Sequence, residues 1–328
     1  MQELSSQCDV KLNKRALSLL LVLALLLLSI MALSIADLKV AYAQESSSSI
    51  DVKVDHQIIV HDGGLVTIND TVTLSKKLGE QPQPLQDFQI GFPYKYKLNL
   101  YHVSAYDSQE PEQRLELDLD TGLGTVGFYG VKVHFKNEVD LNNEESYSFT
   151  LVSEFSDLIT ASPTGEIFDL DFPVYPSLAQ EASVSNTTVF LPPNANYIDS
   201  DPALNQTTSH TLNIVKEPLN AFTSVSGTIT FEPIDSFSLL EVNEVRREIV
   251  LDEWNELLVS DFYTITNKAA EETSTLWALL PQDSYDIDAK DELGNKLTVT
   301  SESEDGAIKA TITLETAVKQ HETTHIFV

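Results

Sequence analysis

Apolar and polar residues alternate along most of the chain beyond residue 50. At the start of this region apolar residues occupy positions 50, 52 and 54, and charged residues occupy positions 51, 53 and 55. A period of two is typical of a β-strand with one buried face. The pattern recurs at residues 57–60, 65–74, 88–92, 98–106, 115–119, 127–135, 147–155, 187–191, 211–215 and 225–232. Short strands separated by turn residues, without sustained helical periodicity, predict an all-β sandwich fold.

Parts of this pattern occur twice. Residues 59–74 are echoed by residues 250–265, and each copy is followed by an apolar strand that ends at a proline. Later in each copy, residues 144–149 resemble residues 322–327. We therefore predict two tandem β-sandwich domains of one design, the first over residues 50–236 and the second over residues 244–328. The alternative is a chance likeness between alternating segments. Since the second copy stops in mid-strand, we expect this domain to be incomplete.

The N-terminal segment has the pattern of a secretory signal. A cluster of cations precedes an uncharged, leucine-rich run at residues 16–36, and small residues stand just before Gln44. Residues 1–43 are therefore predicted to be a signal peptide cleaved before Gln44, or an uncleaved signal anchor, because the run is long enough to span a bilayer. Residues 44–49 follow as a serine-rich tether. In both cases the remainder is exported to the exoplasmic side of the membrane.

Charge and cysteine content narrow the classes of function. The chain carries a formal net charge of −30, with 20 Lys and Arg against 50 Asp and Glu. Nucleic-acid binding needs clustered cations, so we exclude nucleic acid as a partner. The single cysteine, Cys8, precedes the leucine-rich run, so no disulfide can form within residues 44–328. We expect the domains to be held by burial of apolar surface alone.

Two gap-free motifs follow each other in the second predicted domain. In the first, Arg247 is followed seven residues later by Trp254; in the second, a Leu-Leu-Pro run ending at Pro281 leads to Asp-Glu-Leu-Gly-Asn at residues 291–295. The stretch resembles ribophorin I, a non-catalytic subunit of the eukaryotic oligosaccharyltransferase. Residues 54–176 resemble the first ectodomain of that family more loosely.

This resemblance implies a non-enzymatic, cofactor-free role that supports protein N-glycosylation on the exoplasmic side. It implies as partners a catalytic oligosaccharyltransferase subunit and acceptor polypeptides. The membrane is then reached through the N-terminal anchor or through a C-terminal helix beyond this sequence.

The motif residues also have a plain structural interpretation. We expect Trp254 at a hairpin entrance, where its indole covers the end of the sandwich. Asp291 to Asn295 has the composition of a turn, in which Gly294 and Asn295 tolerate a positive φ. Turn glycines and capping tryptophans usually maintain a fold, so this interpretation is the simpler one.

A five-residue match to the zinc-peptidase signature H-E-x-x-H needs separate consideration. His321 and His325 are the two histidines, and zinc binding requires them on one face of a helix. The β-branched and aromatic residues between position 323 and the last residue favour a strand, in which residues four apart lie too far from each other to share a metal ion. A secreted metalloprotease is therefore the remote alternative.

Other candidate sites are weak. Asp120-Thr121-Gly122 resembles one loop of an aspartic protease, but the second Asp-Thr-Gly is missing, so a strand-ending turn is favoured. An acidic cluster at residues 283–292 offers oxygen ligands for calcium without the spacing of a known motif. Its weak metal candidates are Asp286, Asp288 and Asp291, and a solvated turn is the favoured interpretation.

Three Asn-x-Thr sequons are candidate glycosylation sites: Asn69, Asn186 and Asn205. The last two lie in polar, loop-bounded stretches and are the better candidates.

We therefore expect a ribophorin-like, membrane-associated subunit. A free-standing cell-surface adhesin or envelope protein is the alternative from another class, since acidic β-sandwiches suit both.

Overall fold

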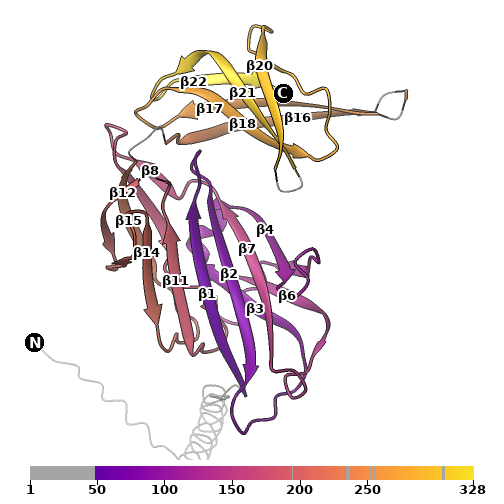
Figure 1. Cartoon of the computed structure of the whole chain (residues 1–328), viewed down its shortest axis with the longest axis vertical. Helices are drawn as coiled ribbons and strands as arrows, with labels where there is room; N and C mark the ends of the chain where they lie inside the picture. Colours follow the sequence, from indigo (N-terminus) through magenta and orange to yellow (C-terminus); the bar gives the residue numbers. More distant parts are fainter. Residues whose placement is uncertain (1–48, 194, 234–236, 252, 255, 305–306) are drawn as a thin grey trace, which may run out of the picture. The chain divides into compact units, whose positions relative to one another are not determined.

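The computed structural model describes residues 49–193, 195–233, 237–251, 253–254, 256–304 and 307–328 (Figure 1). The predicted signal, residues 1–43, and residues 44–48 of the tether lie outside these ranges. The described residues form β-strands almost throughout, with one 3-10 helix, η1 (Tyr94–Asn99). No helix among them has the length and apolar character needed to cross a membrane.

The first part of the chain contains a seven-stranded sheet with the order β13-β14-β11-β1-β2-β7-β4. Two four-stranded sheets, β10-β3-β6-β5 and β12-β15-β9-β8, share one hydrophobic core with it. The strands of the large sheet are β1 (Ile50–Val60), β2 (Val66–Lys76), β4 (Leu100–Asp107), β7 (Ser146–Phe155), β11 (Val184–Phe190), β13 (Asn205–Gln206) and β14 (Thr211–Lys216). Those of the smaller sheets are β3 (Leu85–Pro93), β5 (Glu116–Leu119), β6 (Phe128–Val139), β8 (Ile159–Ala161), β9 (Phe168–Pro173), β10 (Ser177–Leu178), β12 (Ala195–Asp201) and β15 (Ser226–Pro233).

Alternation explains which faces of these strands are buried. Every second residue of β1 from Ile50 to Val60 is buried, and β2 repeats the pattern from Val66 to Leu74. Aromatic side chains fill the space between the layers: Phe149 of β7 makes an edge contact with Phe88 of β3, with ring centroids 5.8 Å apart. Burial of this inner face is the main source of stability, because the described residues contain no cysteine.

The remaining strands form a second seven-stranded sheet with the order β16-β17-β22-β19-β20-β21-β18. A smaller hydrophobic core lies between its two halves and includes Ile265, Leu276, Ile312 and Ile326. The strands are β16 (Leu240–Leu251), β17 (Leu257–Asn267), β18 (Thr273–Pro281), β19 (Ala289–Asp291), β20 (Lys296–Glu304), β21 (Ala307–Val318) and β22 (Thr323–Phe327). Both parts of the chain are therefore sandwich-like, as the alternation predicted.

The two parts share one strand topology. The order β1-β2-β7-β4 in the first matches β16-β17-β22-β19 in the second, and β3-β6-β5 matches β18-β21-β20. All of these neighbouring pairs are antiparallel. The repetition seen in the sequence is thus a repetition of the fold.

Two strand boundaries differ from the predicted ones. The predicted strand at residues 98–106 begins only at Leu100, because residues 94–99 form η1 directly after Pro93. The two predicted segments at residues 50–55 and 57–60 are one continuous strand, β1, in which His56 takes an inward position that the pattern assigns to an apolar residue. Because His56 is polar and faces inward, the alternation alone did not show that the two segments form one strand.

Candidate functional site

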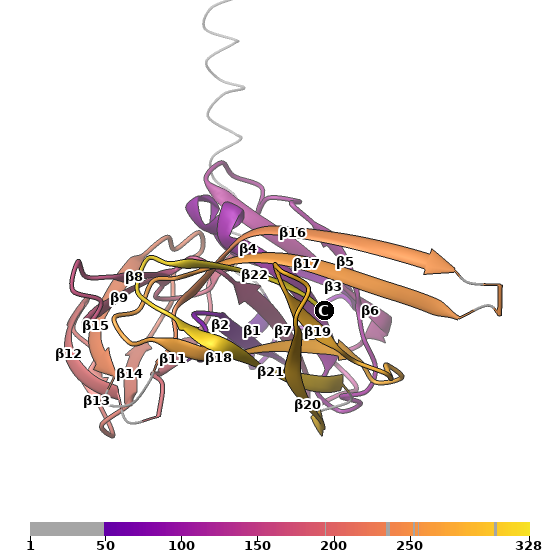
Figure 2. The ribbon, with the colours of Figure 1, turned by 90° about the horizontal axis from the view of Figure 1, so that it is seen from above.

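A long hairpin made by β16 and β17 extends beyond the other strands of its sheet (Figure 2). We call its outer part, residues 245–261, the arm. The two strands pair continuously from Val245 opposite Tyr263 to Leu251 opposite Leu257. The neighbouring strand β22 pairs with β17 only from Thr266 to Phe262, so the outer end of β17 has no such neighbour among the described residues.

The arm exposes apolar side chains on both of its faces. On the face that continues inward to Tyr263 and the second core lie two cross-strand pairs, Ile249 with Val259 and Leu251 with Leu257. These four side chains are between 49 % and 67 % exposed. Soluble proteins rarely expose contiguous apolar surface of this kind unless it binds something. The arm is therefore the candidate interaction site of the molecule.

An ion pair marks the base of the arm on the same face. Arg247 of β16 stands directly opposite Asp261 of β17, and its guanidinium donates two hydrogen bonds of 2.7 Å to the two carboxylate oxygens. The hydroxyl of Tyr263 donates a third, 2.9 Å long, to Oδ2 of Asp261. Asp261 is only 3 % exposed, so these three donors replace the water that a carboxylate loses on burial.

The three groups shift each other's pKa values. The hydrogen bonds from Arg247 hold the pKa of Asp261 below its ordinary value. Burial, followed by the hydrogen bond to Asp261, raises the pKa of Tyr263 to about 12. The same carboxylate raises the pKa of Arg247, which stays charged. The charges therefore fix the register of the hairpin where the covered part of the sheet ends and the exposed arm begins.

A similar pair lies at the matching place in the first part of the chain. His56 of β1 stands opposite Asp70 of β2, and its Nδ1 is 2.5 Å from Oδ1 of the carboxylate. The other ring nitrogen, Nε2, donates to the carbonyl oxygen of Pro173 at 3.0 Å. Both side chains are almost completely buried. Each domain thus carries a cross-strand pair between a basic group and a buried carboxylate on its first two strands.

Of the ribophorin-like motif residues, Trp254 is placed differently from the prediction. It lies at the tip of the arm and is 78 % exposed, so its indole does not cover the end of a sandwich. The reason is that the pairing of β16 with β17 continues to Leu251 and Leu257, beyond the part of β17 that pairs with β22, which places their connection away from the core. Arg247 holds Asp261 as described above, and Pro281 is the last residue of β18.

The motif at residues 291–295 forms the predicted turn. The carboxylate of Asp291 accepts hydrogen bonds from the backbone N–H groups of Leu293 and Asn295 and from the side-chain amide of Asn295. These bonds lower the pKa of Asp291. Gly294 has a φ of 85°, whereas Asn295 is absent from the residues with positive φ. Only the glycine therefore needs the conformational freedom that the sequence suggested for both.

The two histidines of the H-E-x-x-H match do not share a helix. His325 lies in β22, where its Nδ1 is 3.1 Å from the hydroxyl of Thr264 and its ring stacks on Phe262. His321 precedes the strand, with a φ of 62°. The predicted strand is confirmed, and the local structure lacks the helical face that the zinc-peptidase signature requires.

Two of the three acidic candidates for a metal site are engaged in other contacts. Asp288 faces Lys296 at 3.6 Å, and Asp291 bonds within its own turn. Asp286 has a φ of 53° in the loop before β19. Among the residues that the structure describes, no group of three or more His, Cys, Asp and Glu is arranged to hold a metal ion.

The three sequons differ in their surroundings. Asn205 lies in the edge strand β13 and is exposed, as are Gln206 and Thr207 after it. Asn186 lies inside the large sheet in β11, and its side-chain amide bonds to Asp55 and Asn213. Asn69 lies in β2 with its side-chain oxygen buried. Asn205 is therefore the most exposed of the three asparagines, whereas Asn69 and Asn186 are half-buried in paired strands.

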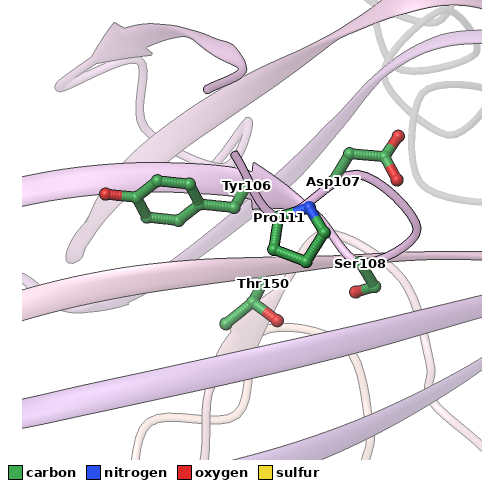
Figure 3. Close-up of a pocket in the computed structure, with 5 residues that line it drawn as sticks. All are labelled: Tyr106, Asp107, Ser108, Pro111 and Thr150. Carbon is green, nitrogen blue, oxygen red and sulfur yellow. The ribbon is translucent and has the colours of Figure 1, made fainter. Parts of the chain in front are cut away.

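A surface depression of about 400 Å³ in the first domain is lined by Tyr106, Asp107, Ser108, Pro111 and Thr150 (Figure 3). The carboxylate of Asp107 accepts hydrogen bonds from Tyr147 and from the backbone of Gln109. It has no second carboxylate or histidine among these neighbours with which to exchange a proton.

Asp120 of the Asp-Thr-Gly match pairs with Lys97 at 2.6 Å in a turn where Asp120 and Gly122 both have positive φ. This is the strand-ending turn that the sequence favoured.

Comparison with known proteins shows no matching family model and no matching curated protein. Among solved structures, an M1 zinc metallopeptidase from Deinococcus radiodurans is 12 % identical with a TM-score of 0.28, and the match covers 72 % of this chain and 50 % of that one. A Mu homology domain from Danio rerio is 10 % identical with a TM-score of 0.20, over 68 % of this chain and 88 % of that one. The BSP domain of a biofilm-associated protein is 10 % identical with a TM-score of 0.23, over 87 % of this chain and 65 % of that one.

The chain thus spans about half the length of the metallopeptidase chains that it matches. With TM-scores this low, the three likenesses assign neither a family nor an activity to the chain.

Proposed function

We propose that this chain is a non-catalytic, membrane-associated subunit on the exoplasmic side of a membrane, resembling ribophorin I and supporting protein N-glycosylation by an oligosaccharyltransferase. The single observation that carries the proposal is the arm. It is a paired hairpin whose outer end presents apolar side chains to solvent, which is what a subunit needs in order to bind a larger partner.

The arm lies within the stretch that resembles ribophorin I. Among the motif residues, Arg247 fixes the base of the arm through Asp261, and the turn at residues 291–295 connects β19 to β20 in the same sheet. Trp254 stands at the exposed tip. Tryptophan at an exposed tip is the kind of residue that dominates binding energy at protein interfaces. The motif therefore contains residues that stabilise the sheet and one exposed tryptophan, and this combination supports a binding role.

The partner proposed from the resemblance is a catalytic oligosaccharyltransferase subunit. The chain supplies no chemistry of its own in this proposal: its part is to hold the partner, and acceptor polypeptides near it, on the exoplasmic side.

The test is affinity purification of the membrane-associated protein in mild detergent, followed by mass spectrometry and an assay of oligosaccharide transfer in the eluate. We expect a glycosyl-transferring membrane protein to copurify with the wild type. We expect much less of it with Trp254→Ala, and an unchanged amount with Tyr101→Ala, a control for loss of an aromatic side chain that is 77 % exposed in the first domain. Recovery of the chain alone, or only with envelope components, would instead favour a free-standing surface protein.

A further inference from the structure

The outer face of the large sheet in the first domain carries a row of hydroxyl groups. Two pairs bridge β2 and β7: the hydroxyls of Thr71 and Thr150 lie 2.9 Å apart, and so do those of Thr73 and Ser148. All four residues are partly exposed. A hydroxyl can donate one hydrogen bond and accept two. Pairing uses one of the two hydrogens in each pair, which leaves the other hydrogen and several lone pairs for a ligand.

This face is uncharged along two neighbouring strands. The outward residues over this stretch are Asn69, Thr71, Thr73 and Ser75 of β2 and Ser146, Ser148, Thr150 and Val152 of β7. In the chain as a whole, 21 % of the residues are charged. The face therefore suits a neutral ligand that forms hydrogen bonds, because it offers no charge with which to recognise an ion.

The depression of about 400 Å³ lies at the edge of the same face, where β4, β7 and the loop after β4 meet (Figure 3). Tyr106 of β4 stands directly opposite Thr150 of β7, so the row of hydroxyls continues into an aromatic ring. Pro111 adds a second apolar ring to the lining. The volume falls within the range of about 300–1,000 Å³ that is typical of small-molecule sites.

Two of the lining residues are held in position by their neighbours. The guanidinium of Arg114 lies over the ring of Tyr106, 5.8 Å from its centroid, as a cation–π contact. The Asp107 carboxylate accepts one hydrogen bond at each oxygen, from the backbone N–H of Gln109 at 2.8 Å and from the hydroxyl of Tyr147 at 2.9 Å. A carboxylate has about four lone-pair sites, so each oxygen keeps one for a ligand. The depression thus combines a positioned ring with a positioned acceptor.

A saccharide has the chemistry that matches these groups. One face of a sugar ring is a layer of C–H groups that packs on an aromatic ring, and its edge carries hydroxyls that both donate and accept hydrogen bonds. Tyr106 and Pro111 offer the apolar contact, and Thr150 and Asp107 offer partners for the hydroxyls. The residues on both sides of Pro111 are glutamates, which disfavour an anionic sugar by repulsion.

We propose that the first domain binds a neutral saccharide in the depression beside Tyr106, with further sugar units lying along the hydroxyl row of β7 and β2. The ring of Tyr106 packs against the C–H face of one sugar, and the Asp107 carboxylate accepts hydrogen bonds from its hydroxyls. The hydroxyl pairs at Thr150 and Ser148 bind the next units. The site uses no residue of the arm, so this inference goes beyond the proposed function and is tested separately from it.

The test is saturation-transfer difference NMR on the full chain in a detergent without a sugar headgroup. The probes are maltotriose, mannotriose and chitotriose, each titrated to give a dissociation constant, with trigalacturonic acid as the charged comparison. Tyr106→Ala removes the ring, Tyr106→Phe keeps it, and Thr150→Val removes a hydroxyl at nearly constant shape. The matched controls are Tyr101→Ala, at a 77 % exposed tyrosine of the same strand, and Thr228→Val, at an exposed threonine of β15.

We expect at least one of the three neutral trisaccharides to bind the wild type, and trigalacturonic acid to bind at least about tenfold more weakly. Tyr106→Ala weakens binding about tenfold or more, and Thr150→Val about threefold or more. Tyr106→Phe and the two controls stay within about twofold of the wild type. Circular dichroism checks that every variant is folded, which is expected because the replaced side chains lie on outer faces of their sheets.

The inference is overturned if none of the three neutral trisaccharides binds, if Tyr106→Ala or Thr150→Val binds as tightly as the wild type, or if the controls weaken binding equally. It is also overturned if trigalacturonic acid binds as tightly as the neutral sugars, or if a peptide of alternating lysine and proline binds at Tyr106 and no saccharide does. If a saccharide binds as expected but no transferase copurifies with the chain, only the proposed function fails.

Discussion

The buried carboxylates of Asp70 and Asp261 are the residues on which the two hairpins depend. Each lies in the inward phase of a strand whose other inward residues are apolar, and each has a basic partner on the facing strand. A buried charge is costly unless it is paired and hydrogen-bonded, so removing one partner costs more than the pair contributes. The pair at Arg247 is the more informative one to test because the guanidinium is partly exposed and can be replaced without opening a cavity.

Replacing Arg247 by methionine leaves the Asp261 carboxylate with one donor, Tyr263. We expect Arg247→Met to lower the free energy of unfolding by about 2 kcal/mol, below the cost of breaking a fully buried pair because the guanidinium lies half in water. Urea denaturation measures the change. Lys132→Met is the control: its contact with Asp87 is 4.0 Å long between side chains that are 31 % and 39 % exposed, and its loss is expected to cost less than about 0.5 kcal/mol. Equal effects of the two substitutions would contradict the role given to Arg247.

His61 gives a pH dependence whose sign can be worked out. Burial lowers its pKa below the ordinary 6.5, against a weaker opposing effect of Glu154. Since the unfolded chain then binds more protons than the folded one, the free energy of unfolding falls as the pH drops through 6.5 towards the folded pKa. His61→Gln keeps a donor for the hydroxyl of Thr67, which lies 2.9 Å from Nε2, but it does not titrate.

We therefore expect the wild type to lose more stability than His61→Gln when urea denaturation is repeated from pH 7.5 down to 5.5. His102→Gln, which changes an exposed histidine, serves as the control and is expected to follow the wild type. A wild type and a His61→Gln protein with parallel stability curves would show that the ring is not held neutral by burial.

At the scale of elements, the same hairpin serves two purposes in the two domains. In the first domain, the inner face of β1 and β2 is buried in the main core. In the second, the outer parts of β16 and β17 extend beyond the other strands and expose the matching face. The expected cost of truncation differs accordingly. We expect Ile58→Ala to lower the free energy of unfolding by about 2–5 kcal/mol through a cavity, and Ile249→Ala by less than about 0.5 kcal/mol.

The comparison of Ile58→Ala with Ile249→Ala is made by chemical denaturation of the two single variants under one set of conditions. A large loss for Ile249→Ala would mean that the arm is covered in solution, and the correspondence drawn from the repeat would then extend to its packing as well.

The sequence alone predicted the strands better than it predicted which side chains pair across them. Alternation located β1, β2 and β7 because their inward residues are apolar almost without exception, and the repeat followed from it. The pairs His56–Asp70 and Arg247–Asp261 were not predicted, since they depend on strand register across a turn. The available signal was a polar residue at an inward-facing position: His56 among valines and isoleucines, and Asp70 between Ile68 and Val72.

The exposure of the arm could not be predicted either. An apolar run such as residues 249–251 predicts a buried strand, and only the structure shows that these side chains are exposed. Trp254 was misplaced for this reason: a tryptophan between two apolar strands suggests a cap on a core, but its hairpin continues beyond the part of β17 that pairs with β22 and leaves the indole exposed.

At the scale of the whole molecule, one design is used twice with two outcomes. In the first copy, further strands cover the inner face of the hairpin, and among the described residues of the second copy this face and the edge of β16 are exposed. The net charge of −30 favours solubility, whereas the arm exposes apolar side chains to solvent. This arrangement supports a protein whose task is to hold a partner rather than to transform a substrate.

The measurement that tests this account most directly is oligosaccharide transfer to an acceptor peptide in membranes from cells that lack the chain. The account predicts a lower transfer rate in these membranes, restored by the wild type and by Leu78→Ser/Leu98→Ser but not by Ile249→Ser/Leu251→Ser. A transfer rate that is the same with and without the chain, or full restoration by Ile249→Ser/Leu251→Ser, would contradict it.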